Sequence, residues 1–169
     1  MIPRYFLFGI ILSLLVTFAD QASKSWVLSL VFQPPGAPDI TKAFHIDRIT
    51  SFLNLVLGFN RGVSFGMFNT HSEFGSWILS SISLAITAVL LVWMWQTDKK
   101  LVALALSLII GGALGNVIDR LSIGAVVDFL DFHYAGLHWP AFNIADMAIT
   151  CGAATLIWDS LFGPRENRK

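Results

Sequence analysis

Two aspartates, Asp128 and Asp146, lie in stretches of the sequence that are otherwise largely apolar, GAVVDFL and FNIADMAI. An ionisable group at the centre of a membrane helix costs about 2.5 to 3.5 kcal/mol, so such positions favour a functional role. Two carboxylates in one poorly solvated site tend to share a proton. The ionised member can then take a proton from water while the protonated member hydrogen-bonds a scissile carbonyl. The pair therefore favours peptide hydrolysis of the aspartic-protease kind.

Each aspartate also has a structural interpretation that the residues alone leave open. If a membrane span begins near Ala141, a rise of about 1.5 Å per residue places Asp146 roughly 8 Å inside the helix, which is too deep for simple capping. Its carboxylate could still lie in the favourable field of the helix amino end and reach towards water. Asn143 is the better candidate for a helix cap. Asp128 could be exposed by a hairpin at the membrane surface.

Other residues with catalytic or metal-binding chemistry are weaker candidates. GVSFG at residues 62–66 matches the G-x-S-x-G nucleophile pattern, but that motif needs an α/β sheet and a general-base histidine, whereas Ser64 is expected in an outer loop. The spacing of His133 and His138 fits no helical metal pair. The single cysteine, Cys151, excludes a disulfide within the chain and a cysteine-ligated zinc site. We therefore expect no metal and no cofactor.

The composition indicates which environment must hold these side chains. The chain has 169 residues, of which 55% are hydrophobic and 13% are charged, and its mean hydropathy is +0.68. These values lie far from those of ordinary soluble proteins, so much of the chain is expected in lipid. Eleven basic and eleven acidic side chains cancel, and we expect no nucleic-acid partner.

Four segments are long and apolar enough to cross a membrane as helices, because about 20 apolar residues suffice. A single membrane domain, residues 1–169, is predicted to contain them near residues 4–23, 75–96, 101–118 and 141–162. Lys99 and Lys100 mark the short turn after the second span as cytoplasmic by the positive-inside rule. Both termini are then predicted to be cytoplasmic. The expected fold is an all-α membrane protein built as a bundle of four transmembrane helices.

Two outer segments, residues 25–74 and 119–140, connect the predicted spans. From Phe44 to Phe68 the first mixes apolar and β-branched residues in partial alternation, with glycine breaks, which predicts short strands. We expect a small extracytoplasmic β-rich layer there and a compact loop in the second segment. Both Asp128 and Asp146 lie towards this outer face, so a shared site near the interface is geometrically possible.

Four motifs of the chain, taken together and in order, resemble those of the bacterial lipoprotein signal peptidases, also called signal peptidase II. They are DQASK at 20–24, FNRGVSFGMF at 59–68, GGALGNVIDRLSIGAVVDFL at 111–130 and WPAFNIADMAIT at 139–150. Any one of them is a weak signal. Four in sequence, at family-like spacing between four spans, are highly specific, and the resemblance extends over the whole chain.

The resemblance implies a membrane aspartyl endopeptidase that removes signal peptides from diacylglyceryl-modified prolipoproteins, on the amino side of the lipidated cysteine. Asp128 and Asp146 match its catalytic pair. The residues that match those around its substrate and inhibitor cleft are Asp20, Lys24, Asn60, Gly62, Asn116, Arg120 and Asn143. The expected partners are these prolipoproteins, membrane lipid and inhibitors like the cyclic peptide globomycin. We expect a monomer in the bacterial inner membrane, with its active site towards the periplasm.

Several alternatives stay open at the level of the sequence. Arg120 could pair locally with Asp119, and Asn116 and Asn143 could tie helices together through side-chain hydrogen bonds. A small proton-coupled transporter could use an aspartate relay through Asp20, Asp128 and Asp146. A noncatalytic assembly factor would lose folding or binding, but no turnover, when either aspartate is replaced.

Overall fold

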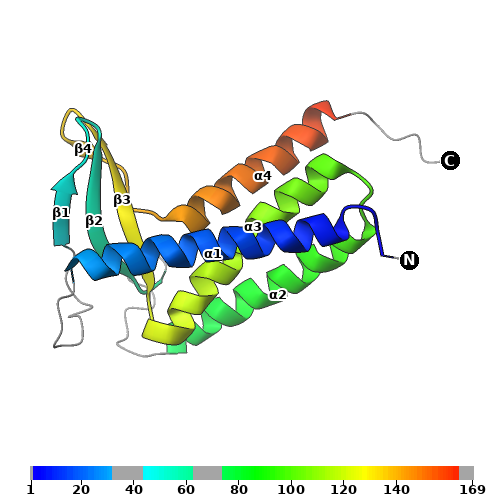
Figure 1. Cartoon of the computed structure of the whole chain (residues 1–169), viewed down its shortest axis with the longest axis horizontal. Helices are drawn as coiled ribbons and strands as arrows, with labels where there is room; N and C mark the ends of the chain where they lie inside the picture. Colours follow the sequence, from blue (N-terminus) through cyan, green and yellow to red (C-terminus); the bar gives the residue numbers. More distant parts are fainter. Residues whose placement is uncertain (1, 32–43, 63–73, 164–169) are drawn as a thin grey trace.

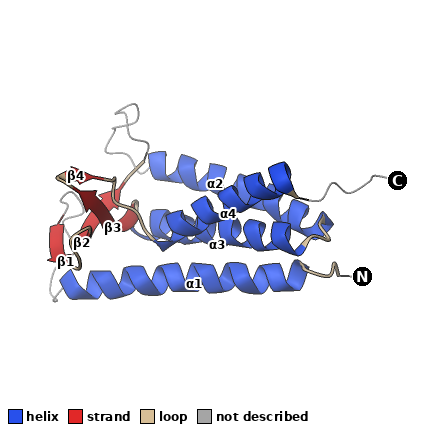
Figure 2. Ribbon diagram, turned by 90° about the horizontal axis from the view of Figure 1, so that it is seen from above, coloured by secondary structure: helices blue, strands red, loops and turns tan. Residues whose placement is uncertain are grey.

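Four helices run side by side, and a small sheet lies at one end of the bundle (Figure 1 and Figure 2). The computed structural model describes residues 2–31, 44–62 and 74–163. The helices are α1 (Phe6–Val31), α2 (Phe74–Gln96), α3 (Lys100–Ile123) and α4 (Ile144–Phe162). Each is long and apolar enough to cross a membrane. The predicted four-helix membrane fold with a small β-rich layer is confirmed.

Two helices extend further than the predicted spans. α1 continues past residue 23 to Val31, and α3 continues past residue 118 to Ile123. Asp119 therefore lies inside a helix and not after it. Both helices continue past their charged residues. Lys24 of α1 and Asp119 of α3 form an ion pair across the interface between the two helices, so neither charge is left unpaired inside the bundle.

α3 is the central helix of the bundle and packs against each of the other three. In its most apolar stretch 61% of the residues are buried, against 17% or less in the other helices. Large apolar side chains of those helices point outward, as in Phe18 (72% exposed), Val89 (67%) and Ile157 (61%). An apolar exterior of this extent suits helices that are surrounded by lipid.

A ladder of polar contacts joins α1 to α3 at intervals of four residues. Ser13 Oγ donates to the carbonyl oxygen of Ser107 at 3.1 Å, and Thr17 Oγ1 donates to that of Gly111 at 2.9 Å. Gln21 Nε2 continues the series with the next carbonyl of α3 at 3.1 Å. Because both sets of numbers rise together, α1 and α3 are parallel. Side-chain hydrogen bonds of this kind hold helices together in lipid.

The sheet contains four strands in the order β1-β2-β3-β4, each antiparallel to its neighbour. The strands are β1 (Phe44–Arg48), β2 (Leu53–Asn60), β3 (Val126–Tyr134) and β4 (Leu137–His138). The first two fall in the stretch that was predicted to form strands. β3 and β4 fall where a loop was predicted. That prediction was wrong because β3 is held by pairing with β2 and by packing on α1, contacts between distant residues that its run VVDFLDFHY does not reveal.

A small apolar core joins the sheet to the carboxyl-terminal end of α1. Val27 of α1, Leu55 and Leu57 of β2, and Val127 and Phe129 of β3 are all 5% exposed or less and pack together. The side chains of β3 alternate between the two faces of the sheet. Since Val127 and Phe129 point into this core, Asp128 points to the opposite face.

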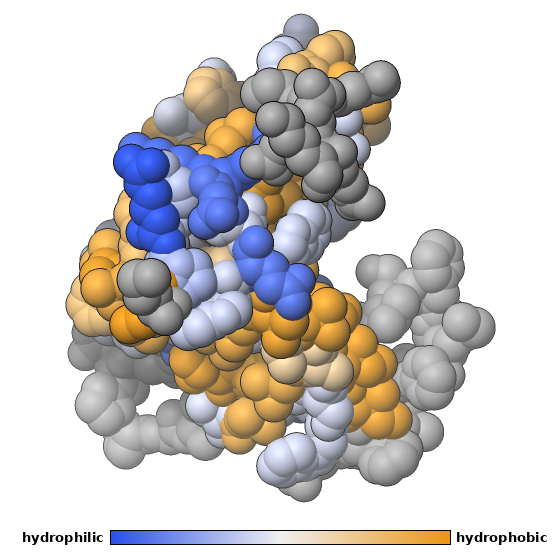
Figure 3. All heavy atoms as spheres, turned by 90° about the vertical axis from the view of Figure 1, so that its right-hand side faces the viewer, coloured by the Kyte–Doolittle hydropathy of each residue, from blue (hydrophilic) through white to orange (hydrophobic). Residues whose placement is uncertain are grey.

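At the other end of the bundle lie the start of α1, the turn between α2 and α3, and the end of α4 (Figure 1). Hydrophilic side chains gather on this end face among hydrophobic ones (Figure 3). Lys99 and Asp159 form an ion pair there at 3.3 Å. The cytoplasmic location of this end stays a prediction.

Candidate active site

Asp128 lies in the middle of a strand and is only 5% exposed. Its Oδ2 accepts a hydrogen bond from Asn60 Nδ2 at 3.2 Å. Its Oδ1 accepts one from Asn143 Nδ2 at 2.8 Å. The alternative of an exposed hairpin is therefore wrong for this aspartate, because the strand next to it covers the position and amides occupy both of its oxygens.

Asp146 is the third residue of α4 and takes part in the cap of that helix. Asn143 is the N-cap: its side-chain oxygen accepts from the Asp146 backbone N–H at 2.9 Å, and Asp146 Oδ2 accepts from the Asn143 N–H at 3.3 Å. This reciprocal pair is a capping box. The prediction that Asn143 caps the helix is confirmed. The prediction that Asp146 lies too deep for capping was wrong, because α4 begins at Ile144 and not near residue 141.

Asn143 connects the two aspartates directly. Its fully buried carboxamide donates to Asp128 while its oxygen and backbone N–H bond to Asp146. The start of α4 therefore sets the relative position of the two carboxylates.

Asp146 and Asp128 each accept a hydrogen bond from a further asparagine side chain, and a second hydrogen bond to the oxygen of that side chain fixes its orientation. Asn116 Nδ2 donates to Asp146 Oδ1 at 2.9 Å, while its Oδ1 accepts from Lys24 Nζ at 3.1 Å. Asn60 donates to Asp128 while its Oδ1 accepts from the N–H of Gly62 at 3.2 Å. Gly62 has a φ of 148°, a conformation that favours glycine.

Behind Asn116 lies a buried ionic cluster of Asp20, Lys24 and Asp119. Lys24 is 2% exposed, and its Nζ lies 2.7 Å from Asp20 Oδ2 and 2.8 Å from Asp119 Oδ2. Asp20 Oδ1 accepts from the backbone N–H of Ala145 at 2.9 Å, and Asp119 Oδ2 accepts from that of Val127 at 3.0 Å. The cluster therefore joins α1 and α3 to the starts of α4 and β3.

Arg120 lies beside the same site but makes a different contact from the one considered in the sequence. Asp119 forms its ion pair with Lys24. The guanidinium of Arg120 donates to the Asn116 carbonyl at 3.4 Å and is attracted by the carboxylates of Asp146, Asp119 and Asp128. Within the part of the chain that the structure describes, its Nε has no hydrogen-bond partner.

Burial and the neighbouring Asp146 carboxylate raise the pKa of Asp128 to about 6, against the amide donors Asn60 and Asn143 and the more distant charge of Lys24. Burial disfavours the charged form, and a second carboxylate has the same effect. Asp128 therefore holds a proton more readily than an ordinary aspartate.

A separate polar cluster lies at the tip of the sheet. Asp131 accepts from Asn54 Nδ2 at 2.8 Å and from His138 Nδ1 at 2.8 Å. Burial opposes ionisation, but these hydrogen bonds lower the pKa of Asp131.

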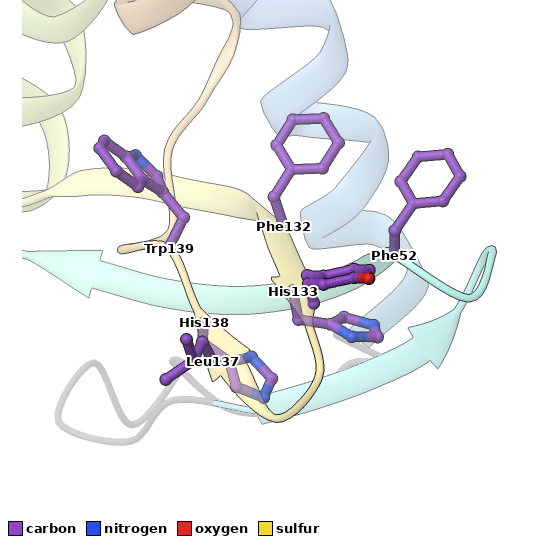
Figure 4. Close-up of a pocket in the computed structure, with 7 residues that line it drawn as sticks. Phe52, Phe132, His133, Leu137, His138 and Trp139 are labelled. Atoms are coloured by element: carbon purple, nitrogen blue, oxygen red, sulfur yellow. The ribbon is translucent and has the colours of Figure 1, made fainter.

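Figure 4 shows Phe132 and Trp139 extending away from His133 and His138. An open pocket of about 390 Å³ here is lined by Phe52, Phe132, His133, Tyr134, Leu137, His138 and Trp139.

The structure brings all nine predicted site residues into one connected network. The role of Asp119 as an ion-pair partner of Lys24 was not predicted from the sequence. A signal was present, because Asp119 follows Asn116 by three residues and so lies on the same face of a helix. The contribution of Gln21 was also missed: its Nε2 donates to Asp119 Oδ1 at 2.8 Å.

Comparison with known proteins identifies the family of this chain. The family model described as signal peptidase (SPase) II matches residues 12–162. The chain belongs to the signal peptidase II family. A lipoprotein signal peptidase of Burkholderia vietnamiensis is 44% identical over 159 residues, which cover 93% of this chain and 89% of the relative. One of Methylocella silvestris is 38% identical over 165 residues, which cover 98% and 91%.

Solved structures agree with this assignment. A bacterial membrane enzyme solved by the in meso method at 1.9 Å resolution has a TM-score of 0.74 and 28% identity, covering 96% of this chain and 98% of that one. A second, at 2.3 Å, has a TM-score of 0.71 and 29% identity, covering 100% and 99%. This family member is therefore a multi-pass membrane protease that cleaves signal peptides from prolipoproteins.

Proposed function

We propose that this signal peptidase II is an aspartyl endopeptidase in which Asp128 and Asp146 activate water between them. The observation that carries the proposal is the shared network: Asn143 bonds both carboxylates, and each carboxylate receives one further amide. Two carboxylates held together in a poorly solvated site supply the acid and the base that peptide hydrolysis needs. Peptide hydrolysis by this route forms no covalent bond to the enzyme.

The surroundings of the two carboxylates support different roles for them. Asp146 accepts from Asn116 Nδ2 and from the Asn143 N–H at the amino end of α4, where the helix dipole favours negative charge. We assign it the role of base, which removes a proton from the attacking water. Asp128 is almost fully buried and retains a proton up to a pH of about 6. It donates that proton towards the scissile carbonyl oxygen.

The proposed substrate is a diacylglyceryl-modified prolipoprotein, cut on the amino side of its lipidated cysteine. The apolar outer faces of α1, α2 and α4 would hold acyl chains, and the substrate would enter from the bilayer. Asn60, which is exposed, and Arg120, which is half-buried, can contact it. A cyclic peptide of the globomycin type would compete at the same carboxylates. We place the protein in the inner membrane as a monomer, with the sheet on the periplasmic side.

Cleavage of a purified diacylglyceryl-modified prolipoprotein by the detergent-solubilised protein tests this proposal. Asp128→Asn and Asp146→Asn should each lower kcat by about 10³-fold or more, because either change removes a proton-transfer group. Asp131→Asn is the matched control, since Asp131 lies on the same strand and also bonds an asparagine. Thermal unfolding of each variant shows whether the protein is folded.

Loss of cleavage in the two dyad variants, with cleavage retained in the control, is the expected result. Cleavage at a normal rate by either folded dyad variant would exclude that residue as an acid or base. If both variants cleave normally while the wild type is active, the aspartyl mechanism is wrong.

A further inference from the structure

We propose that Lys24 is a positioning residue for catalysis. It bridges Asp20 and Asp119, which bond the backbone N–H groups of the residues that precede Asp146 and Asp128. It also orients the side-chain amide of Asn116 that bonds Asp146. This inference rests on the proposed roles of Asp128 and Asp146. It assigns to Lys24 a role in the rate of the chemical step and not in substrate contact. Its burial, at 2% exposed, leaves no surface for a substrate to reach.

The first observation is that Lys24 uses all three of its N–H donors within the protein. They meet Asp20 Oδ2 at 2.7 Å, Asp119 Oδ2 at 2.8 Å and Asn116 Oδ1 at 3.1 Å. An ammonium group has three donors and no acceptor. The Asn116 atom that faces Lys24 must therefore be the oxygen, and its NH₂ group must turn to Asp146, where it donates at 2.9 Å.

The second observation is where the two acidic partners of Lys24 place their remaining bonds. Asp20 accepts from the N–H of Ala145, the residue before Asp146. Asp119 accepts from the N–H of Val127, the residue before Asp128. The two aspartates lie on different elements, α4 and β3. Lys24 is the cation that links these two contacts, so it sets the spacing between the dyad backbones.

The third observation is that the packing leaves little freedom around the cluster. A Cβ atom added at Gly115 would overlap the carboxylate of Asp20. Gln21 Nε2 holds Asp119 Oδ1 from the other side at 2.8 Å. If Lys24 is removed, Asp20 and Asp119 cannot move to fill its place without also moving the N–H groups of Ala145 and Val127 that they bind.

The test compares Lys24→Met with Thr17→Val in the solubilised full-length protein. Methionine keeps most of the apolar stem of lysine and removes the charge and all three donors. Thr17→Val removes one hydrogen bond between α1 and α3, two turns from Lys24 and outside the cluster. Both variants should unfold at a lower temperature. We expect kcat to fall about 10²-fold for Lys24→Met, with KM changed less than about threefold, because small misplacements of reacting groups cost this much.

The pH profile gives a second readout that a purely structural role would not move. The positive charge of Lys24 favours the ionised form of Asp128, so its removal should move the alkaline limb of kcat to higher pH. Thr17→Val should leave both kcat and this limb unchanged. If Lys24→Met does not fold, Asp119→Asn takes its place, since it weakens the contacts to Lys24 and Val127 while the pair of Lys24 with Asp20 remains.

The outcomes separate this inference from the proposed function. If Asp128→Asn and Asp146→Asn are inactive but the folded Lys24 and Asp119 variants both keep wild-type kcat and pH profile, the positioning role is wrong and the dyad stands. The inference is equally wrong if Lys24→Met changes KM alone. If the dyad variants themselves cleave normally, the proposed function fails first.

Discussion

Replacing Asn143 separates the two tasks that this residue performs in the structure. Its oxygen caps α4 by accepting from the Asp146 N–H at 2.9 Å, and its Nδ2 donates to Asp128 at 2.8 Å. Serine is also a good N-cap, whereas alanine is not. Asn143→Ser therefore keeps an acceptor for the cap and loses the donor to Asp128, together with the bond from the same Nδ2 to the Val127 carbonyl at 3.1 Å. Asn143→Ala loses both.

The structure gives the size and the sign of each effect. Losing the cap should cost Asn143→Ala about 1 kcal/mol relative to Asn143→Ser. A hydrogen bond to a charged group contributes about 1.5 to 3 kcal/mol, and about 1.4 kcal/mol corresponds to one pKa unit. The donated bond favours the ionised form of Asp128, so its loss should raise the pKa of that carboxyl from about 6 by roughly one to two units.

This raised pKa also predicts how stability changes with pH. The folded-state pKa of Asp128 lies above the ordinary value near 3.9, so holding the ionised form is unfavourable and the folded protein loses stability as pH rises from about 4 to the folded pKa. Without the donor this loss continues to higher pH. Asn143→Ser loses its bond to the Val127 carbonyl at every pH, and its deficit against the wild type should therefore grow by up to about 3 kcal/mol between pH 5 and pH 8.

The assay is the pH dependence of kcat, together with thermal unfolding at pH 5 and pH 8. Asn54→Ser is the matched control, because Asn54 donates to Asp131 at the same distance of 2.8 Å on the same pair of strands. It should lower stability and leave the alkaline limb of kcat in place. An alkaline limb that stays fixed, or moves to lower pH, in folded Asn143→Ser would refute the reasoning about this donor.

Three further predictions follow from individual contacts. Cleavage by the wild type should fall about tenfold per pH unit above pH 6, because only protonated Asp128 can donate to the carbonyl, and a flat profile up to pH 8 would contradict this role. Gly112→Ala should destabilise the protein by about 1 to 3 kcal/mol in thermal unfolding, because the added Cβ would overlap the Ala145 carbonyl oxygen. Gly75→Ala is its control, since no atom lies within 4 Å of that Cβ, and equal losses would contradict the packing argument. The pKa of Asp131 is lowered, so its stabilising contacts are fully present above about pH 4 and are lost as the pH falls through its folded pKa; Asp131→Asn should lower the unfolding temperature at pH 6, and this difference should shrink as the pH falls below about 4.

Much of the membrane fold could be predicted from the sequence because it depends on local apolar length. The four helices, the strand-like stretch around β2 and the cap at Asn143 all follow from residues close in the chain. β3 could not be recognised in the same way. Its run VVDFLDFHY has no regular alternation of apolar and polar residues, because one end packs on α1 and the other forms the polar tip with Asn54 and His138. Its pairing with β2 joins residues about 70 positions apart, as between Asn60 and Val126.

The candidate site shows the same division between local and distant information. Each polar residue in an apolar segment could be recognised as unusual by the cost of placing it there. The partners of each residue could not be predicted. Lys24 contacts Asp20, four residues away on α1, and Asp119, which lies on α3, and the second contact depends on how the two helices pack. The helical position of Asp119 decides the matter, and this depends on α3 continuing to Ile123.

Burying the charges of Asp20, Lys24 and Asp119 is unfavourable for folding, and we infer that the cluster is kept because it positions the backbone around the dyad. Replacing a complete buried ion pair or triad by apolar residues is often neutral or stabilising, so stability alone does not account for Asp20, Lys24 and Asp119. Apolar side chains could fill the same space between α1 and α3, but they could not accept from the N–H groups of Ala145 and Val127. Those two bonds place one residue of α4 and one of β3, each next to an aspartate of the dyad. A site made from two separate elements needs such a link, because neither element alone fixes the distance between its carboxylates.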